Sequence, residues 1–228
     1  MSVYQIKPWS YSSIKTYETC PRKYQAEKVT KEVPFTDSDA TIYGKEVHKV
    51  CEDHIKLGVP IPQKYSYLVP IMQSISNMAG VKHTELELGI AKQDGRLVAC
   101  EFHAEDVWFR GIADLVIING DKARILDYKT SKSAKYADTK QLALMAAAVF
   151  LKFPEVQHIK AGLVFVVCNA FIPVEYSRDR TLDIFADLDG LLQQRESSYN
   201  TGVFNPKPNA LCRKWCGVHS CPHNGIIS

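Results

Sequence analysis

A carboxylate and an ammonium group stand two residues apart in ILDYKTS (residues 125–131), as Asp127 and Lys129. The apolar residues before them are typical of a buried strand, in which side chains two positions apart share one face. Burying either charge without a partner is costly. The pair is therefore either a structural ion pair or a site that performs chemistry, and these two residues alone leave both interpretations open.

A second carboxylate, Asp114, lies in the neighbouring predicted strand. Asn119-Gly120 predicts a hairpin between the two strands. A two-residue turn places Asp114 diagonal to Asp127, a four-residue turn places it directly opposite, and a three-residue loop separates them. In the first two registers the carboxylates can hold one divalent cation, which suits metal-assisted hydrolysis of a phosphodiester. Lys129 would then orient the attacking water or stabilise charge on phosphorus.

The seven cysteines fall into two groups. Three stand singly among apolar or helical residues and are predicted to be small buried hydrophobic side chains: Cys51, Cys100 and Cys168. Four others could close one metal site if the two ends of the chain meet: Cys20, Cys212, Cys216 and Cys221. Structural zinc usually prefers two tighter cysteine pairs, although His219 and His223 could replace thiolates in a zinc site.

Helical and strand periodicities predict the elements that position these residues. A helix near Tyr11–Tyr17 is followed by Pro21, which starts another. The remaining elements are predicted in this order: helices at 41–57 and 65–78, strands at 85–90, 97–102, 108–118 and 123–129, a helix at 138–151, a strand at 162–168 and a helix at 182–198. This order predicts an α/β domain with a mixed central β-sheet flanked by helices.

GIADLVI (111–117) followed by ILDYKTS resembles the core signature of the PD-(D/E)XK nuclease superfamily, in its RecB-like exonuclease branch. GKEVH (44–48) resembles the helical G-x-x-x-H of that branch, whose histidine is usually a metal ligand. Gln141 resembles a glutamine that contacts the site or the DNA, although Met145 stands where the family often has tyrosine. The resemblance implies a restriction-endonuclease-like core with two sets of site residues. The catalytic set is Asp114, Asp127, Lys129 and Gln141. The Mg²⁺ or Mn²⁺ ligands are His48, Asp114, Asp127 and Tyr128. Glu85 or Glu87 is expected to add an acidic group, and the sequence does not choose between them.

The N-terminal S-x-S-S-I-x-x-Y-x-x-C-P-x-x-Y (residues 10–24), with one cysteine there and three near the C-terminus, resembles the iron–sulfur variant of RecB-like nucleases. Such clusters occur in helicase–nuclease subunits and in the nucleases of CRISPR adaptation. The resemblance implies a [4Fe–4S] cluster on Cys20, Cys212, Cys216 and Cys221 that joins elements 10–30 and 202–223; zinc, or no metal, remains an alternative. We expect one nuclease domain over 1–228, with its core at about 41–198.

The function implied by the resemblance is metal-dependent DNA exonuclease activity in recombination, repair or end processing. An endonuclease of the same fold and a non-catalytic nucleic-acid-binding module are the alternatives. The sequence has no G-x-x-x-x-G-K-[ST] motor motif, so a separate helicase, annealing or recombination protein is an expected partner. Residues that could line a DNA strand path by charge and stacking are Arg22, Lys23, Tyr24, Lys132, Lys135 and Tyr136.

The composition of the chain limits which partners and which location in the cell are expected. The 228 residues are 46% hydrophobic and 23% charged, with a net charge of +3 and a pI near 8.4, which permits a nucleic-acid partner without requiring one. No uninterrupted apolar run reaches the roughly 18 residues of a membrane span. The first nine residues do not resemble a signal peptide. We therefore expect a cytoplasmic protein with no membrane partner.

Overall fold

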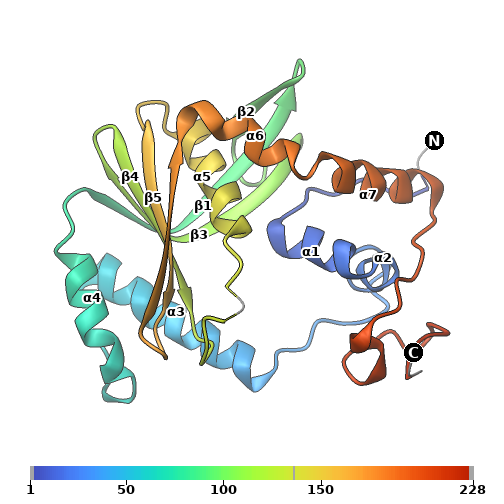
Figure 1. Ribbon diagram of the computed structural model, residues 1–228, viewed down its shortest axis with the longest axis horizontal. Helices are drawn as coiled ribbons and strands as arrows, with labels where there is room; N and C mark the ends of the chain where they lie inside the picture. The colour runs from blue at the N-terminus through green and yellow to red at the C-terminus, as the bar shows by residue number, and fades with distance from the viewer. Residues whose placement is uncertain (1–2, 136, 226–228) are drawn as a thin grey trace. The chain divides into compact units, whose positions relative to one another are not determined.

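The computed structural model describes residues 3–135 and 137–225 (Figure 1). The chain divides into two compact units. The terminal unit comprises Met1–Thr36 and Ala186–Ser228, and the central unit comprises Asp37–Phe185. That the two units form a single nuclease domain over 1–228 stays a prediction. In the described chain, no helix is long and apolar enough to cross a membrane.

A six-stranded sheet forms the middle of the central unit, in the order β2-β1-β3-β4-β5-β6. Its strands are β1 (Val81–Gln93), β2 (Arg96–Cys100), β3 (Val107–Asn119), β4 (Lys122–Lys129), β5 (His158–Phe165) and β6 (Ala170–Ser177). Neighbouring strands are antiparallel except β4 and β5, which are parallel and are joined through a helix, α5 (Lys140–Lys152). The predicted mixed sheet flanked by helices is therefore confirmed.

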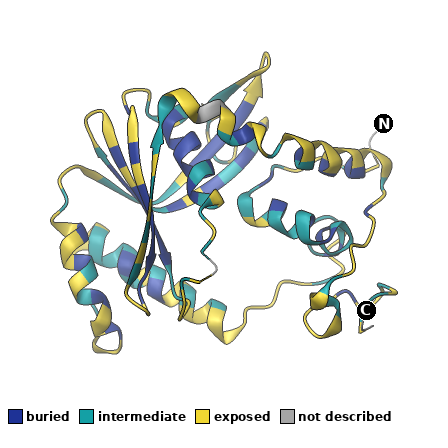
Figure 2. Cartoon of the chain, in the orientation of Figure 1, coloured by how far each residue is buried: buried dark blue, intermediate teal, exposed yellow. Residues whose placement is uncertain are grey.

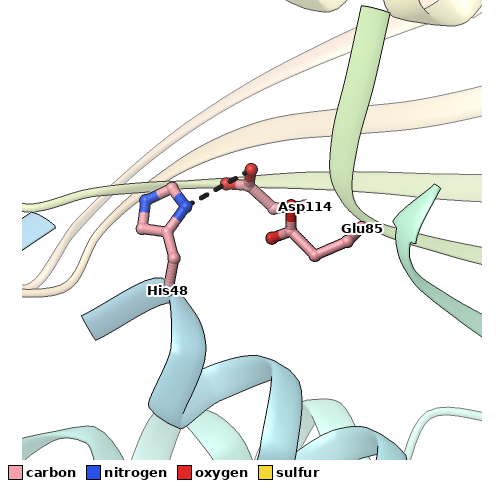
Figure 3. A group of neighbouring side chains, drawn as sticks. All are labelled: His48, Glu85 and Asp114. Atoms are coloured by element: carbon pink, nitrogen blue, oxygen red, sulfur yellow. Dashed lines mark ion pairs between the residues drawn. The ribbon is translucent and has the colours of Figure 1, made fainter. Parts of the chain in front are cut away.

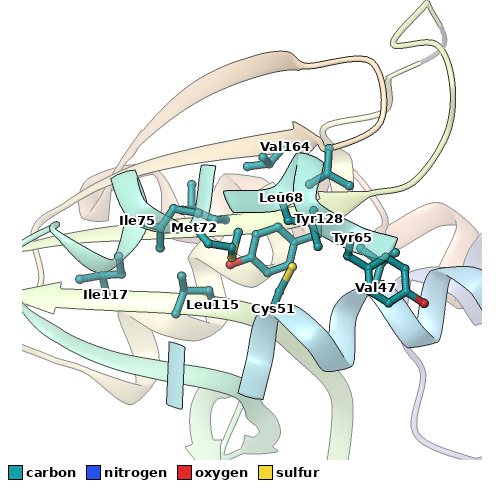
Figure 4. Packing of buried hydrophobic residues seen from close by; sticks show 12 residues of the cluster. Val47, Cys51, Tyr65, Leu68, Met72, Ile75, Leu115, Ile117, Tyr128 and Val164 are labelled. Carbon is teal, nitrogen blue, oxygen red and sulfur yellow. The ribbon is translucent and has the colours of Figure 1, made fainter. Parts of the chain in front are cut away.

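Two helices cover one face of the sheet. α3 (Asp39–Leu57) begins at Ser38, whose hydroxyl accepts a hydrogen bond from the Thr41 amide, and ends at Gly58, whose φ of 69° suits glycine. A 3₁₀ turn (Gln63–Leu68) leads into α4 (Val69–Ser76). The helices bury their apolar sides against β3, β4 and β5 (Figure 4). The cluster includes Val47, Cys51, Leu68, Met72, Leu115, Ile117, Leu126, Tyr128 and Val164. This packing fixes α3 against the strands that carry the predicted carboxylates.

The helix α5 is buried along most of its length, from Leu142 to Phe150 (Figure 2). Its side chain Met145 lies over Gly111 of β3. A Cβ atom at Gly111 would stand 2.5 Å from Met145 Cε, so a larger residue would require the flexible end of the Met145 side chain to move. The glycine of the G-x-x-D pattern therefore leaves room for Met145 of α5.

The terminal unit is held together by aromatic packing around a buried arginine. Its helices are α1 (Tyr11–Thr19), α2 (Pro21–Tyr24), a π-helical turn (Gln25–Val29) and α7 (Asp189–Thr201). Arg195 of α7 is 3% exposed and lies over the rings of Tyr24 and Tyr199, 5.5 and 4.8 Å from their centroids. Its Nε donates to the Tyr24 hydroxyl at 2.8 Å, and its Nη2 donates to the Lys7 carbonyl at 2.6 Å. These contacts bind the N-terminal helices to α7.

Three elements differ from the prediction. The edge strand β6 was not predicted, and Pro173 within it is a residue that edge strands tolerate. The predicted helix 182–198 is two helices, α6 (Thr181–Ala186) and α7. The predicted helix 65–78 begins as a 3₁₀ turn, because Tyr65 has a non-helical backbone with φ −115° and ψ 20°.

Candidate active site

The hairpin between β3 and β4 sets the position of the two aspartates. Asn119 pairs with Lys122 and Leu115 pairs with Leu126. Continuing this register by one residue places Asp114 directly opposite Asp127, as expected for a four-residue turn. The turn itself is the two residues Gly120 and Asp121, one position later than predicted. Gly120 adopts a φ of 60° at the turn, a conformation that glycine accommodates at little cost. The structure therefore places both carboxylates on one face of the sheet.

His48 of α3 reaches Asp114 from the neighbouring helix (Figure 3). Its Nδ1 lies 3.5 Å from Asp114 Oδ1, and its Nε2 donates to the Tyr128 carbonyl at 3.0 Å. A carbonyl only accepts, so the proton of the neutral ring belongs on Nε2. The Nδ1 lone pair then faces the carboxylate. Asp114 is itself held, because its Oδ2 accepts the Tyr128 amide at 2.7 Å.

Glu85 of β1 completes this group. One ligand atom each from His48, Glu85 and Asp114 lies within 4.8 Å of the other two (Figure 3). Thr84 of β1 pairs with Leu115 of β3, and Leu86 pairs with Ala113. Glu85 lies between them in β1 and is therefore opposite Asp114 of β3. Its φ of 47° lies in the left-handed region, which is costly for a residue other than glycine. Strained backbone of this kind concentrates at functional sites.

The acidic residue that the sequence left open is thus Glu85. Glu87 is exposed and is outside the group. Alternation in a strand gives both residues the same expected face, so periodicity could not separate them. The deciding feature is the left-handed backbone at Glu85, for which the sequence carries no signal of its own.

Asp127 and Lys129 lie beside this group and contact each other. Asp127 Oδ2 is 2.6 Å from Lys129 Nζ, and Nζ donates to Gln141 Oε1 of α5 at 3.3 Å. Asp127 is 6% exposed, whereas the Lys129 side chain is 33% exposed and so reaches the surface. Lys129 also lines an open cleft of about 670 Å³ together with His48, Glu85 and Tyr128. A ligand in this cleft would meet both the lysine and the carboxylate group.

The electrostatics of the site favour a cation. Burial raises the pKa of Asp127 to about 6, and the Asp114 charge adds to the rise, although Lys129 opposes it. Burial and then Asp114 raise the pKa of Glu85. Burial lowers the pKa of His48, but Asp114 and the Tyr128 carbonyl outweigh burial, so that pKa is raised as well. All three groups hold protons more tightly than usual, and a divalent cation would replace those protons.

The donor set fits one divalent ion. Ligands bonded to a Mg²⁺-sized ion at about 2.1 Å stand no more than about 4.2 Å apart, and the three atoms here lie within 4.8 Å of one another, so small side-chain shifts would bring them to bonding distance. Two carboxylates and an imidazole suit Mn²⁺, and the carboxylates suit Mg²⁺. Of the predicted ligands, the structure gathers His48 and Asp114, with the Tyr128 carbonyl in contact with His48. Asp127 lies outside the tight group and contacts Lys129 instead.

All four cysteines predicted for a cluster lie in the terminal unit. The Lys207 amide lies 3.4 Å from Cys20 Sγ, and the Asn209 amide lies 3.5 Å from Cys212 Sγ. The Asn209 side chain also donates to the Thr19 carbonyl at 3.3 Å. Residues 207–209 therefore contact both Cys20 and Cys212. No three cysteine sulfurs in the described part of the chain lie within 4.8 Å of one another. Thiolates on one zinc ion would stand about 3.8 Å apart, so a tight zinc site is not formed there.

Several other expectations need correction. Tyr24 is 2% exposed, so it cannot stack on a nucleotide base. Arg22 pairs with Glu32 at 2.6 Å and Lys23 with Glu27 at 3.7 Å, whereas Lys132 and Lys135 are exposed. Tyr136 lies outside the described residues. Among the single cysteines, Cys51 is buried as predicted, Cys100 is half-buried, and Cys168 is exposed at the turn after β5, so that prediction was wrong for Cys168.

Comparisons with known proteins agree with this geometry. The family model of the PD-(D/E)XK nuclease superfamily matches residues 8–224, and the chain belongs to this superfamily. Its members are nucleases, which places the carboxylate group in a hydrolase of nucleic acids. No curated protein sequence matched the chain.

Two solved structures share the fold. A crystal structure of SSO0001 has a TM-score of 0.51 and 18% identity, covering 97% of this chain and 89% of that one. A crystal structure from Eubacterium rectale, described provisionally as an exonuclease, has a TM-score of 0.56 and 11% identity, with the same coverages. At these identities the likeness concerns the fold alone.

Proposed function

We propose that this protein is a Mg²⁺- or Mn²⁺-dependent DNA exonuclease that acts in recombination, repair or end processing. The observation that carries the proposal is the grouping of His48, Glu85 and Asp114 beside the Asp127–Lys129 pair. A purely structural ion pair would not need a strained glutamate and a histidine from another helix next to it.

The residues of the site have separate roles in this proposal. His48, Glu85 and Asp114 would hold the ion, and the ionised Asp127 carboxylate would add negative charge beside it. A bound divalent ion supplies a Lewis acid for the phosphate and lowers the pKa of water. Lys129 stabilises negative charge on the scissile phosphate, and Gln141 holds the Lys129 ammonium in place through its Oε1. The Tyr128 carbonyl fixes the tautomer and orientation of His48.

We further propose that Cys20, Cys212, Cys216 and Cys221 bind a [4Fe–4S] cluster. All four lie in one unit, and two of their sulfurs lie within hydrogen-bonding distance of backbone amides, a type of contact that tunes such clusters. A cluster binds each thiolate to a different iron atom, so the sulfurs can stand further apart than around one zinc ion. Its role would be structural, joining α1 and α2 to the tail at 202–223.

The substrate and setting follow from the same proposal. DNA is the expected substrate, and a separate helicase, annealing or recombination protein is the expected partner. None of the seven cysteines, all of which lie in the described residues, forms a disulfide. Because thiols persist in a reducing compartment, the cytoplasm remains the proposed location.

The test uses the full-length protein, purified without oxygen. End-labelled linear DNA and circular single-stranded DNA are incubated with Mg²⁺ or Mn²⁺. Shortening of linear DNA while circles stay intact supports the exonuclease. Cutting of circles would show an endonuclease of the same fold, and no cleavage of either substrate with any divalent ion would remove the nuclease proposal.

A further inference from the structure

Trp215 stands on the surface of the tail. It is 77% exposed, whereas Trp9 is 1% exposed and Trp108 is half-buried. Tryptophan is the largest apolar side chain and is mostly buried in folded proteins, so such exposure calls for an explanation. Leu211, one helical turn earlier, is 40% exposed, so a small apolar surface extends beside the ring.

The backbone that carries Trp215 is fixed by hydrogen bonds. The Trp215 amide donates to the Leu211 carbonyl at 3.0 Å. On either side, the Cys212 carbonyl accepts the Gly225 amide at 2.9 Å, and the Cys216 carbonyl accepts the Asn224 side chain at 2.7 Å. The loop from Cys212 to Cys216 is therefore closed by residues 224–225. A ring presented from a fixed loop loses little conformational entropy when it binds a ligand.

The charged residues next to Trp215 in the sequence of the tail have one sign. Residues 197–228 contain no aspartate or glutamate, but they contain Lys207, Arg213 and Lys214. The two residues directly before Trp215 are Arg213 and Lys214, and both are exposed. The terminal unit as a whole has ten Lys and Arg against six Asp and Glu, a net charge of +4, and the central unit has a net charge of −1. The ligand that complements this surface is a polyanion.

We infer that Trp215 is a stacking platform for a base of single-stranded nucleic acid, with Arg213 and Lys214 contacting the adjoining phosphates. An aromatic ring between cations is the combination that binds single strands. In a duplex both faces of a base are already stacked, so the exposed indole favours an unpaired base. This inference rests on the proposed nuclease function, because it assigns a second binding site for the same substrate class.

The test measures binding without cleavage. A fluorescently labelled single-stranded oligonucleotide is titrated, in chelator, with the full-length wild-type protein and with variants, and anisotropy is recorded. Trp215→Ala should weaken binding about 5- to 150-fold, the range of one stacked base, and Trp215→Phe should restore most of it. Lys214→Gln should lower the salt dependence of binding by about 0.7 in the log–log slope. Phe35→Ala is the matched control. Phe35 is 76% exposed, but the sequence around it holds the acidic residues Glu32, Asp37 and Asp39, and its loss should leave affinity unchanged.

The possible results separate this inference from the proposed function. If the wild-type protein binds DNA and Trp215→Ala binds equally well, with unchanged thermal transitions, the stacking role is refuted and the nuclease proposal stands. If neither protein binds single-stranded DNA at all, the stacking role is overturned, and the cleavage test with Mg²⁺ or Mn²⁺ decides the nuclease proposal separately. If Trp215→Ala leaves affinity intact but changes the oligomeric state in sedimentation, the ring serves a protein interface and the inference is also overturned.

Discussion

Replacing Asp127 by asparagine should make the metal-free protein more stable at neutral pH. The Asp127 carboxylate is 6% exposed, and burial followed by the Asp114 charge raises its pKa from 3.8 to about 6. The folded-state value lies above the unfolded-state value, so the protonated carboxyl stabilises the fold below about pH 4, and that contribution is lost as the pH rises through about 6. At about 1.4 kcal/mol per pKa unit, the loss amounts to at most ~3 kcal/mol. Asparagine has the shape of the protonated acid and no charge to lose.

The assay is urea denaturation in chelator between pH 4.5 and 7.5. At pH 4.5 the variant should be more stable than the wild type by only about 1 kcal/mol, and at pH 7.5 by up to ~3 kcal/mol. The changes in His48 and Glu85, whose pKa values are also raised, occur in both proteins and largely cancel. Saturating Mn²⁺ should stabilise the wild type more than the variant. A variant that is less stable than the wild type at pH 7.5 in chelator would refute the reasoning, because Asp127 would then be half of a stabilising ion pair.

Three further substitutions separate catalysis, the cluster and backbone strain. Lys129→Ala should keep its thermal transition and Mn²⁺ affinity, while its cleavage rate falls at least about 10²-fold, the usual cost of losing a charge aimed at the reacting group. An unfolded variant would show that the Asp127–Lys129 ion pair is structural instead. Cys216→Ser should lose iron and visible absorbance and unfold at a lower temperature, since binding at a structural metal site is coupled to folding; unchanged metal content and stability would contradict the proposed ligand. Glu85→Gly should have a free energy of unfolding in urea about 1 kcal/mol higher than that of Glu85→Ala, because only glycine adopts a φ of 47° at low cost. Equal free energies of unfolding would show that the backbone at residue 85 is not strained.

The sequence predicted the sheet and the two aspartates because these depend on short-range rules. Alternation placed strands around Asp114 and Asp127, and Asn119-Gly120 predicted their hairpin, so a shared face followed for two of the three turn lengths considered. The position of His48 needed more than alternation. It required α3 to pack over β3 and β4, and only the family resemblance indicated that arrangement in advance.

Other features depend on tertiary contacts that one sequence does not encode visibly. Glu85 and Glu87 are equivalent by periodicity, and the left-handed backbone at Glu85 distinguishes them. Tyr24 was expected to meet DNA because basic residues precede it, yet its ring packs with Tyr199 and Arg195. Exposure alternates along β6 through Pro173, but this proline argues against a strand in the sequence, and only the place of β6 at the sheet edge explains why the strand tolerates it.

The most direct test of the active site compares cleavage by the wild type and Asp114→Asn. Asparagine keeps an oxygen that can accept the Tyr128 amide but removes the charge that faces His48. End-labelled linear DNA is incubated with each protein in Mn²⁺, in excess chelator, and after Mn²⁺ is restored. The wild type should cleave only when the ion is present, and Asp114→Asn should stay folded and inactive under all three conditions. Cleavage by the wild type in excess chelator, or full activity of the folded Asp114→Asn protein, would contradict a metal-dependent site built on His48, Glu85 and Asp114.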